Sequence, residues 1–524
     1  MLFGALPVCA TVKASGDPFA AERALLTQAR GATPQSLWAR DGEASPQARQ
    51  LLAVLHRVGD YGLSSDEFAP LVLTIEAAMD PLDAARVEEA MSLAALRLIR
   101  DLHDGRADPL AAGYELSHRR APVDRITTLN NLASSPDVGA TLAALEPRSS
   151  QYRALKKWLA RYRTIPDVFV PAPVPNGSSV RSGDDYTAAG ALRRRLEELG
   201  DAAPPAAGIA SVGARYDEDL AIAVARFQRR HGLEPDGVLG PRTRDALAVP
   251  ISWRIRQIEL TLERWRWLPD IQAPAVIVNV PQYMLYTLPD PADADPQAQV
   301  RKIPVIVGKE ERQTPVFDSA IEAVVFRPYW EVPRSIVEQE LLPMIQRDPG
   351  YLARNDMEIV RGGGDAVRVL PEGNATISAL RSGSARLRQR PGPRNALGLI
   401  KFVLPNRHEV YLHSTPEARL FGRERRALSH GCIRVSDPTA LAAYLLKDTP
   451  GDWSVDAIEA ATCADATFTV RLARPVPVYI LYGTVVIDGD EALFFDDIYG
   501  YDRRLEVLLS TEESPETARS ARSN

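Results

Sequence analysis

The sequence predicts a multidomain α+β protein, and three observations support this. At 524 residues the chain is longer than one ordinary hydrophobic core allows. Apolar residues recur at helical spacing through about residue 170, and again in a short unit after it. From about residue 273 the pattern changes to short β-branched runs bounded by Pro, Gly or Asp. We therefore expect a helical scaffold, a small three-helix module and a β-rich domain.

Composition narrows the class of protein. A hydrophobic content of 45% and a charged content of 25% are typical of a globular protein that folds in water. A net charge of −6 argues against a general nucleic-acid binder, and no apolar run reaches the ~18 residues of a membrane span. The three cysteines, Cys9, Cys432 and Cys463, are too few for a disulfide framework. We expect Cys463 to be a small buried hydrophobe.

The first third of the chain predicts helices. Residues 1–19 include a short apolar piece without early Lys or Arg, and we expect at most a weak or clipped signal segment there. Residues 20–170 are predicted to form the helical scaffold, with Ser45-Pro46 as a helix start. Residues 166–187 are rich in Pro, Gly and Ser, which predicts a linker.

A compact unit over residues 188–249 follows the linker. Leucines are spaced for one helix ending at Gly200, and Leu220, Val224 and Phe227 are spaced for another. The run from Phe227 to Thr243 resembles the small peptidoglycan-binding domain, whose residues and spacing it matches nearly throughout. A generic three-helix unit, or a module that no longer binds glycan, remains an alternative. Residues 250–268 carry a helical stripe, and we expect this helix to complete the scaffold.

The β-rich domain is predicted over residues 273–505. Residues 328–393 interrupt it with helical and Gly-rich sequence. An excursion of this length is usually a functional lid or disordered. Because exposing Tyr329 and Trp330 in a disordered segment would be unfavourable, we expect a lid. The last residues, 510–524, are rich in Ser, Glu and Arg, which predicts a disordered tail.

One stretch carries reactive side chains. His413 lies nineteen residues before Cys432 and His430 lies two before it. A thiol becomes a nucleophile when a neighbour such as imidazole favours its thiolate. Gly431 would let the backbone approach a substrate, and the N–H groups around Gly431 and Cys432 could stabilise an oxyanion. The stretch therefore predicts a cysteine acyl-transfer site that needs no cofactor.

This stretch has two other interpretations. An inert buried thiol is disfavoured by the polar, Gly-containing surroundings of Cys432. A zinc site could use His408, His413, His430 and Cys432. However, His-x-Cys is a cramped pair of ligands, and neither a second nearby Cys nor an HExxH helix supports it. We therefore predict no metal.

The pattern His413-Ser414-Thr415 followed by Ser429-His-Gly-Cys-Ile-Arg434 resembles the L,D-transpeptidases of bacterial peptidoglycan. Most family members have Gly after the first His, where this chain has Ser414. That departure resembles the large multidomain Gram-negative branch, in which a capping subdomain covers the active site. The resemblance covers nearly the whole chain and is sharpest over residues 395–438.

The resemblance implies a role for each residue of the motif. It makes Cys432 the nucleophile, His413 the proton donor and acceptor, His430 a supporting residue and Gly431 an oxyanion donor. The substrate-binding residues that it implies are Arg434, Ser429, Ser414, Asn395, Tyr329 and Trp330. Arg434 would bind a stem-peptide carboxylate.

The implied reaction joins two peptidoglycan stems. Cys432 would form a thioester with a stem tetrapeptide and release D-alanine. A diamino-acid side chain on a neighbouring stem would then take the acyl group, giving a 3-3 cross-link. The resemblance also implies a periplasmic location, acylation by carbapenems and other wall-synthesis enzymes as partners. Alternatives are an L,D-carboxypeptidase or endopeptidase, a protein-to-wall anchoring enzyme, and a non-catalytic peptidoglycan-binding protein.

Overall fold

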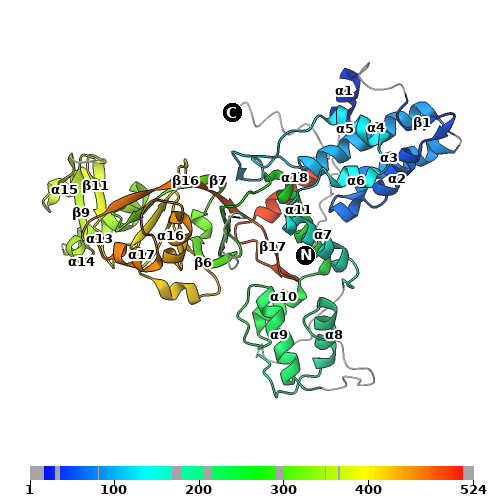
Figure 1. The fold of residues 1–524 in the computed structure, drawn as a ribbon. Coiled ribbons are helices and arrows are strands. Elements are labelled where there is room, and N and C mark those ends of the chain that lie inside the picture. Colours follow the sequence, from blue (N-terminus) through cyan, green and yellow to red (C-terminus); the bar gives the residue numbers. More distant parts are fainter. Residues whose placement is uncertain are drawn as a thin grey trace, which may run out of the picture.

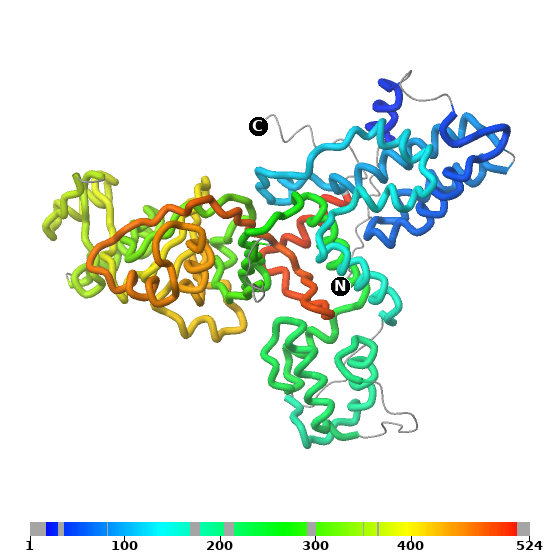
Figure 2. The backbone as a smooth tube through the Cα atoms, in the orientation of Figure 1, coloured from blue at the N-terminus to red at the C-terminus, as the bar shows by residue number. Residues whose placement is uncertain are grey.

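The computed structural model describes residues 17–29, 36–80, 82–167, 179–203, 214–290, 300–348, 350–363 and 366–511. Three lobes radiate from a centre that contains α7, α11, α18 and β17, and the tube in Figure 2 follows the same three arms (Figure 1). The expected signal segment lies almost entirely outside the described residues. The same holds for the Pro-rich part of the expected linker and for most of the expected tail.

The N-terminal lobe is mostly helical. Its elements are α1 (Ala20–Gln28), β1 (Ala39–Arg40), β2 (Glu43–Ala44), α2 (Pro46–Leu55), η1 (Val58–Tyr61), α3 (Ser65–Met79), α4 (Ala84–His103), β3 (Tyr114–Glu115), α5 (Arg125–Ser134), α6 (Val138–Ala143) and α7 (Ser150–Tyr162). Ser45 starts α2 as predicted, because its side chain accepts a hydrogen bond from Ala48 N at 3.1 Å. α4 is buried on nearly all sides and forms the centre of this lobe's core.

This lobe is not separate from the β-rich domain. β3 pairs in parallel with β7 (Val316–Phe326), with Tyr114 beside Val316 and Glu115 beside Phe317. The helical scaffold expected over residues 20–170 is confirmed, and β3 is a short strand that the sequence did not predict. Helical spacing could not show this strand, because two residues are too short for any period.

The small module contains α8 (Ala189–Leu199), α9 (Glu218–Arg230) and α10 (Pro241–Ala248). Its first described residues correct the expected linker boundary. Val180 exchanges backbone hydrogen bonds with Leu239, and Tyr186 N donates to Ala214 O. Residues 180–187 therefore belong to the module. A Pro/Gly/Ser-rich composition does not distinguish a linker from extended chain that is fixed by a partner.

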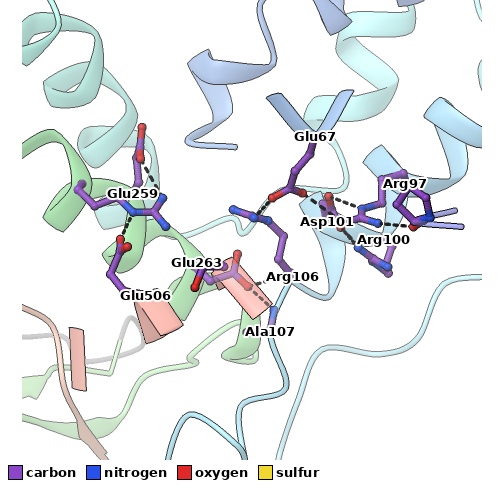
Figure 3. Close-up of polar contacts among 12 residues, drawn as sticks. Glu67, Arg97, Arg100, Asp101, Arg106, Ala107, Glu259, Glu263 and Glu506 are labelled. Atoms are coloured by element: carbon purple, nitrogen blue, oxygen red, sulfur yellow. Dashed lines mark hydrogen bonds and ion pairs between the residues drawn. The ribbon is translucent and has the colours of Figure 1, made fainter. Parts of the chain in front are cut away.

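The helix α11 (Ile251–Trp267) lies where the lobes meet and shares one core with α7, the module and β17. Its Glu263 carboxylate accepts from the backbone N–H groups of Arg106 and Ala107 in the N-terminal lobe (Figure 3). Gly105 (φ 82°) lets that backbone approach, because a Cβ there would lie 2.6 Å from the Trp267 indole nitrogen. α11 is thus fixed to the N-terminal lobe.

A chain of ion pairs continues from this junction into the N-terminal lobe (Figure 3). Arg106 pairs with Glu67, whose second oxygen accepts from Arg97 at 3.1 Å. Asp101 is fully buried and pairs with Arg97 at 3.3 Å and with Arg100 at 2.7 Å. Each buried charge in this chain has a partner, as it must to avoid a desolvation penalty.

The β-rich domain is built on one long sheet. Its strands are β4 (Ala275–Asn279), β5 (Met284–Leu288), β6 (Arg301–Gly308), β7, β12 (Ile400–Val403), β13 (Leu412–His413), β14 (Ala427–Ser429), β15 (Ile433–Val435) and β16 (Phe468–Leu481). The order is β12-β13-β15-β6-β5-β4-β16-β7-β3, and β14 pairs with β6. Because β12 also pairs with β7, the path closes on itself around an apolar core.

Helices and a hairpin complete this domain. They are α16 (Pro438–Leu446), α17 (Val455–Thr462), β17 (Val485–Asp488), β18 (Glu491–Phe494) and α18 (Tyr501–Thr511). α18 runs past residue 505, where the domain was expected to end. Cys463, which follows α17, is exposed, so the expectation of a buried thiol was wrong. Among the described residues, no helix has the length and apolar character needed to cross a membrane.

The expected lid folds as a subdomain with its own apolar core. It contains β8 (Trp330–Glu331), α12 (Arg334–Ile336), the π-helical turn η4 (Val337–Leu341), α13 (Leu342–Arg347), α14 (Tyr351–Arg354), β9 (Met357–Arg361), β10 (Arg368–Val369), α15 (Asn374–Ser382) and β11 (Arg386–Gln389). The antiparallel order is β10-β9-β11-β8. The sequence predicted helical and Gly-rich segments in this subdomain, but it did not predict this sheet. Its arginine-rich strands hide the apolar alternation that predicts β structure.

Candidate active site

The sheet register brings the reactive side chains together. Lys401 on β12 pairs with His413 on β13, and His413 pairs with Arg434 on β15. Successive residues of a strand face opposite sides, so residues two apart share a face. Tyr411 therefore lies on the face of His413, and Cys432 lies on the face of Arg434. One surface of three neighbouring strands thus holds the thiol, an imidazole, a phenol and two cations.

Cys432 lies directly before β15 and is half-buried. Its sulfur contacts Glu409 O at 3.9 Å. Burial raises the pKa of the Cys432 thiol above its ordinary value, and hydrogen bonds from Tyr411 and the charge of Lys401 act against that rise. The thiol is therefore protonated at neutral pH in the free protein.

The imidazole of His413 is buried, with 4% of the residue exposed. Its Nδ1 lies 2.6 Å from Ser414 O, so Nδ1 carries the proton and Nε2 holds the lone pair. Burial, together with the charge of Arg434, lowers the pKa of His413 to about 3. His413 is thus neutral over the physiological range and able to accept a proton.

The loop that carries the nucleophile is fixed by two hydroxyl groups. Ser429 Oγ accepts from Gly431 N at 3.1 Å and donates to Cys432 O at 2.5 Å. Thr314 Oγ1 donates to Gly431 O at 2.8 Å and accepts from Gly308 N at 2.9 Å. Gly431 has φ 115°, a conformation that favours glycine.

These contacts reassign two of the predicted roles. Ser429 is buried, with 2% exposed, and its hydroxyl is committed to the loop backbone. The Gly431 N–H, predicted as an oxyanion donor, already has an acceptor in Ser429. Within the described residues, the Cys432 N–H has no backbone or side-chain acceptor. It is therefore the N–H of this loop that is free for an oxyanion.

Arg434 lies at the open edge of this surface. Its guanidinium pairs with Glu417 at 2.6 Å, and the Arg434 side chain is 18% exposed while that of Glu417 is 48% exposed. An exposed partner of this kind contributes little binding energy and can be displaced. A substrate carboxylate could therefore replace Glu417 on Arg434.

His430 faces away from the thiol, toward the lid. Its Nε2 lies 2.9 Å from Glu340 on η4, and Glu340 also pairs with Arg312 at 3.1 Å. His408 is held elsewhere, with Nε2 2.8 Å from Glu115. The ligands of the zinc alternative therefore do not converge, since His408, His413 and His430 each have a different partner.

Two residues that the resemblance placed at the substrate are buried supports instead. Asn395 is 1% exposed, and its amide donates to Pro328 O, Gln389 O and Arg390 O at 3.0–3.3 Å. These carbonyls lie where the chain enters and leaves the lid. Ser414 is also buried, and its Oγ accepts from the N–H groups that follow Gly398, at 2.7 and 3.0 Å. Neither side chain can reach a substrate, which corrects both assignments.

The two aromatic residues at the lid base have different surroundings. Tyr329 is 37% exposed, with the Arg388 guanidinium 4.1 Å from its ring centroid. Trp330 is partly buried at the start of β8 and packs against the lid core.

Sequence reasoning missed Lys401, Tyr411 and Thr314. The Lys401 ammonium lies 3.8 Å from the Tyr411 ring centroid, and burial raises the pKa of Tyr411, so its hydroxyl stays protonated. Lys401 and Tyr411 did leave a signal. Lys401 is a lone charge in an apolar strand, and Tyr411 is two residues before His413. Thr314 left none, because only the fold brings it to Gly431.

The three lobes match known protein families. Residues 273–456 match the L,D-transpeptidase catalytic domain, and residues 29–159 match a family described as Scaffold domain. Residues 187–247 match a family described as "Putative peptidoglycan binding domain". This chain therefore carries an L,D-transpeptidase catalytic domain together with a scaffold domain and a peptidoglycan-binding domain.

Two known proteins are similar to parts of this chain. A protein of Haemophilus influenzae, named "Putative L,D-transpeptidase", is 32% identical over 252 residues. That match spans 48% of this chain and 49% of the relative, about half the length of each. A crystal structure of an L,D-transpeptidase from Stackebrandtia nassauensis covers 59% of this chain and 97% of its own, at 12% identity and a TM-score of 0.20. That score is too low to support an argument about this chain.

Proposed function

We propose that this protein is a cysteine-dependent L,D-transpeptidase that forms 3-3 cross-links between peptidoglycan stems. The observation that carries the proposal is the shared sheet face of Cys432, His413 and Arg434, in which each has a distinct chemical task. The peptidoglycan-binding domain supports peptidoglycan as the substrate. Because that polymer lies outside the cytoplasmic membrane, the proposed location is the periplasm.

The first half-reaction makes a thioester. His413 Nε2 accepts the thiol proton while Cys432 Sγ attacks the amide carbonyl of the third stem residue. The oxyanion accepts a hydrogen bond from the Cys432 N–H. The C–N bond to the terminal D-alanine then breaks, and His413 returns the proton to the leaving amine.

Activation of the thiol depends on the arriving substrate. In the free protein the Cys432 thiol and the His413 imidazole are both neutral, because burial disfavours charge on both. Cys432 lies beside Tyr411 in register, and His413 is two pairs further along the same two strands, on the same face. Rotation about the Cys432 Cα–Cβ bond moves Sγ from Glu409 O toward His413. The proton then moves as the carbon–sulfur bond forms.

The second half-reaction transfers the acyl group. The side-chain amine of a diamino acid on a neighbouring stem attacks the thioester, and His413 accepts a proton from this amine. The C–S bond breaks and the thiol is restored with that proton. Arg434 binds a carboxylate of a stem peptide in place of Glu417.

Mass spectrometry with a tetrapeptide-bearing muropeptide tests this proposal. Wild-type protein should gain a thioester adduct and yield a cross-linked dimer. Cys432→Ala should do neither, while the matched control Cys463→Ala should behave as wild type, because Cys463 is an exposed residue at the end of α17, outside the strands of the site.

Other outcomes of this experiment contradict the proposal in different ways. Free tripeptide without dimer would show a hydrolase that uses water as the acceptor. A product joined to another protein would show an anchoring enzyme. No adduct with either the muropeptide or a carbapenem would show that the protein is not catalytic and serves only to bind the wall.

A further inference from the structure

We propose that the groove between the peptidoglycan-binding module and the arginine loop, defined as residues 417–426, binds the stem carboxylates of a peptidoglycan strand. This inference rests on the proposed function, because it names how the polymer reaches the same active site. The groove is a cavity of about 320 Å³. Residues of the module, of the arginine loop and of the β-rich domain line it.

The arginine loop connects the active site to the module. At its first residue, Glu417 pairs with Arg434 at 2.6 Å on the catalytic face. Seven residues later, Glu424 pairs with Arg242 at the start of α10 in the module. A strand bound along this loop would therefore contact the module and the site at once.

The loop is held in place from below. Arg426 donates to Val305 O at 3.2 Å, to Tyr283 O at 3.1 Å and to Arg423 O at 3.1 Å. These contacts fix the backbone while Arg423 and Arg425 remain exposed. The groove wall is thus preformed, which reduces the entropy lost when a ligand binds.

The peptidoglycan-binding module, which forms the opposite wall of the groove, is also fixed to the β-rich domain. His231 lies between two rings, 3.9 Å from the Phe227 centroid and 5.6 Å from that of Phe494 on β18. Arg230 donates to Ala492 O at 3.0 Å and pairs with Asp201 at 2.6 Å. The module is therefore docked on the β17–β18 hairpin through buried contacts.

The charges in the groove favour an anion. Six Arg and Lys side chains line it, against four Asp and Glu side chains. Two of the acids pair with two of these cations, Asp488 with Lys302 at 2.6 Å and Glu424 with Arg242, so an excess of two cations remains. Among the described residues, neither Arg423 nor Arg425 has a carboxylate partner. Guanidinium groups without a carboxylate partner can bind the carboxylates of stem peptides.

Charge reversal at the two exposed arginines tests the proposal. In a Cys432→Ala background, R423E/R425E should bind sacculi with tetrapeptide stems about tenfold more weakly than its parent. Binding by the parent should also weaken as salt rises. The matched control R194E/R226E changes the net charge equally at two exposed arginines of the module outside the groove, and it should bind as the parent does.

Two further measurements make the result decisive. With Cys432 restored, R423E/R425E should form the thioester with a small soluble muropeptide at the wild-type rate, because that ligand is too short to need the groove. Sacculi whose stems have been removed by an amidase should bind parent and variant alike.

The inference is overturned if R423E/R425E binds intact sacculi as tightly as the parent, or if R194E/R226E loses as much affinity. It is also overturned if the parent retains its full affinity for stem-free glycan. Absence of a thioester in the wild-type protein would instead refute the proposed function, and the sacculus comparison would still decide whether the groove binds stems.

Discussion

Asn395 should hold the lid closed over the catalytic face, and its removal should open the lid. Its side chain makes four hydrogen bonds at a site that is 1% exposed. The amide nitrogen of Asn395 donates to three carbonyls at the two ends of the lid, and its side-chain oxygen accepts from Leu397 N at 2.8 Å. Asn395→Ala leaves these buried groups without partners.

The magnitude follows from these contacts. The Asn395 amide shares its two N–H groups among the three carbonyls, and each of the four buried backbone groups that loses this partner costs about 1 kcal/mol, so the substitution costs about 4 kcal/mol. The cost falls on the lid base, so it should raise the population of the open lid rather than unfold the chain. Since about 1.4 kcal/mol is a factor of ten, the open population should rise by about a thousandfold.

Limited proteolysis under native conditions measures this population. When opening and closing are fast, the cleavage rate follows the open fraction. Cleavage within residues 328–393 should accelerate by two to three orders of magnitude, by this estimate of about 4 kcal/mol, while cleavage in the module should not change. Hydrogen exchange at β8 and β11 should rise in parallel.

Asn355→Ala is the matched control, because the Asn355 amide bonds only Tyr351 O in its own turn, at 2.8 Å. It should leave lid cleavage near the wild-type rate. Equal cleavage of the Asn395→Ala and wild-type lids would refute this reasoning. So would equal acceleration in the two Asn variants.

Three further predictions concern the nucleophile. Alkylation of Cys432 should accelerate as pH rises through and beyond the ordinary thiol range, with no step between pH 4 and 7, because the pKa of His413 is about 3. Lys401→Met should shift this profile to higher pH, since the ammonium lowers the pKa of the thiol. Thr314→Val should destabilise the Gly431 loop by about 1–3 kcal/mol and slow thioester formation about tenfold or more.

Each of these predictions has a control. Alkylation is followed in a Cys463→Ser background, because that exposed thiol would otherwise react. Lys157→Met removes an exposed ammonium outside the site and should not move the profile. Thr74→Val removes a hydroxyl that bonds only Pro70 O, and it should not affect the reaction. An alkylation step near pH 6, an unchanged Lys401→Met profile, or full activity in Thr314→Val would contradict the respective prediction.

The sequence was informative about the fold wherever local patterns extend over many residues. The Ser45-Pro46 start of α2 and the apolar stripe of α11 follow from capping and helical period. Short or irregular elements were not predictable in this way. The two residues of β3, the lid sheet and the fixed segment 180–187 owe their structure to distant partners.

The same division applies to the candidate site. The motif from His413 to Arg434 indicated cysteine chemistry, because thiol, imidazole and guanidinium are the groups that this chemistry needs and all lie within one short stretch. It could not separate residues that contact a substrate from residues that support them. Ser414 and Asn395 belong to motifs near the site, yet their side chains are fully committed to buried backbone groups.

The sequence by itself therefore determined the chemical groups, the resemblance to the families that residues 187–247 and 273–456 match, and the insertion at residues 328–393. Only the tertiary structure decided which groups face one another. Strand register placed Lys401 beside His413 and Tyr411 beside Cys432, and it directed His430 to Glu340 on the lid. It also joined the arginine loop to the module through Arg242. The physical reason is that register and lobe docking arise from contacts between residues far apart in the chain, which no local pattern encodes.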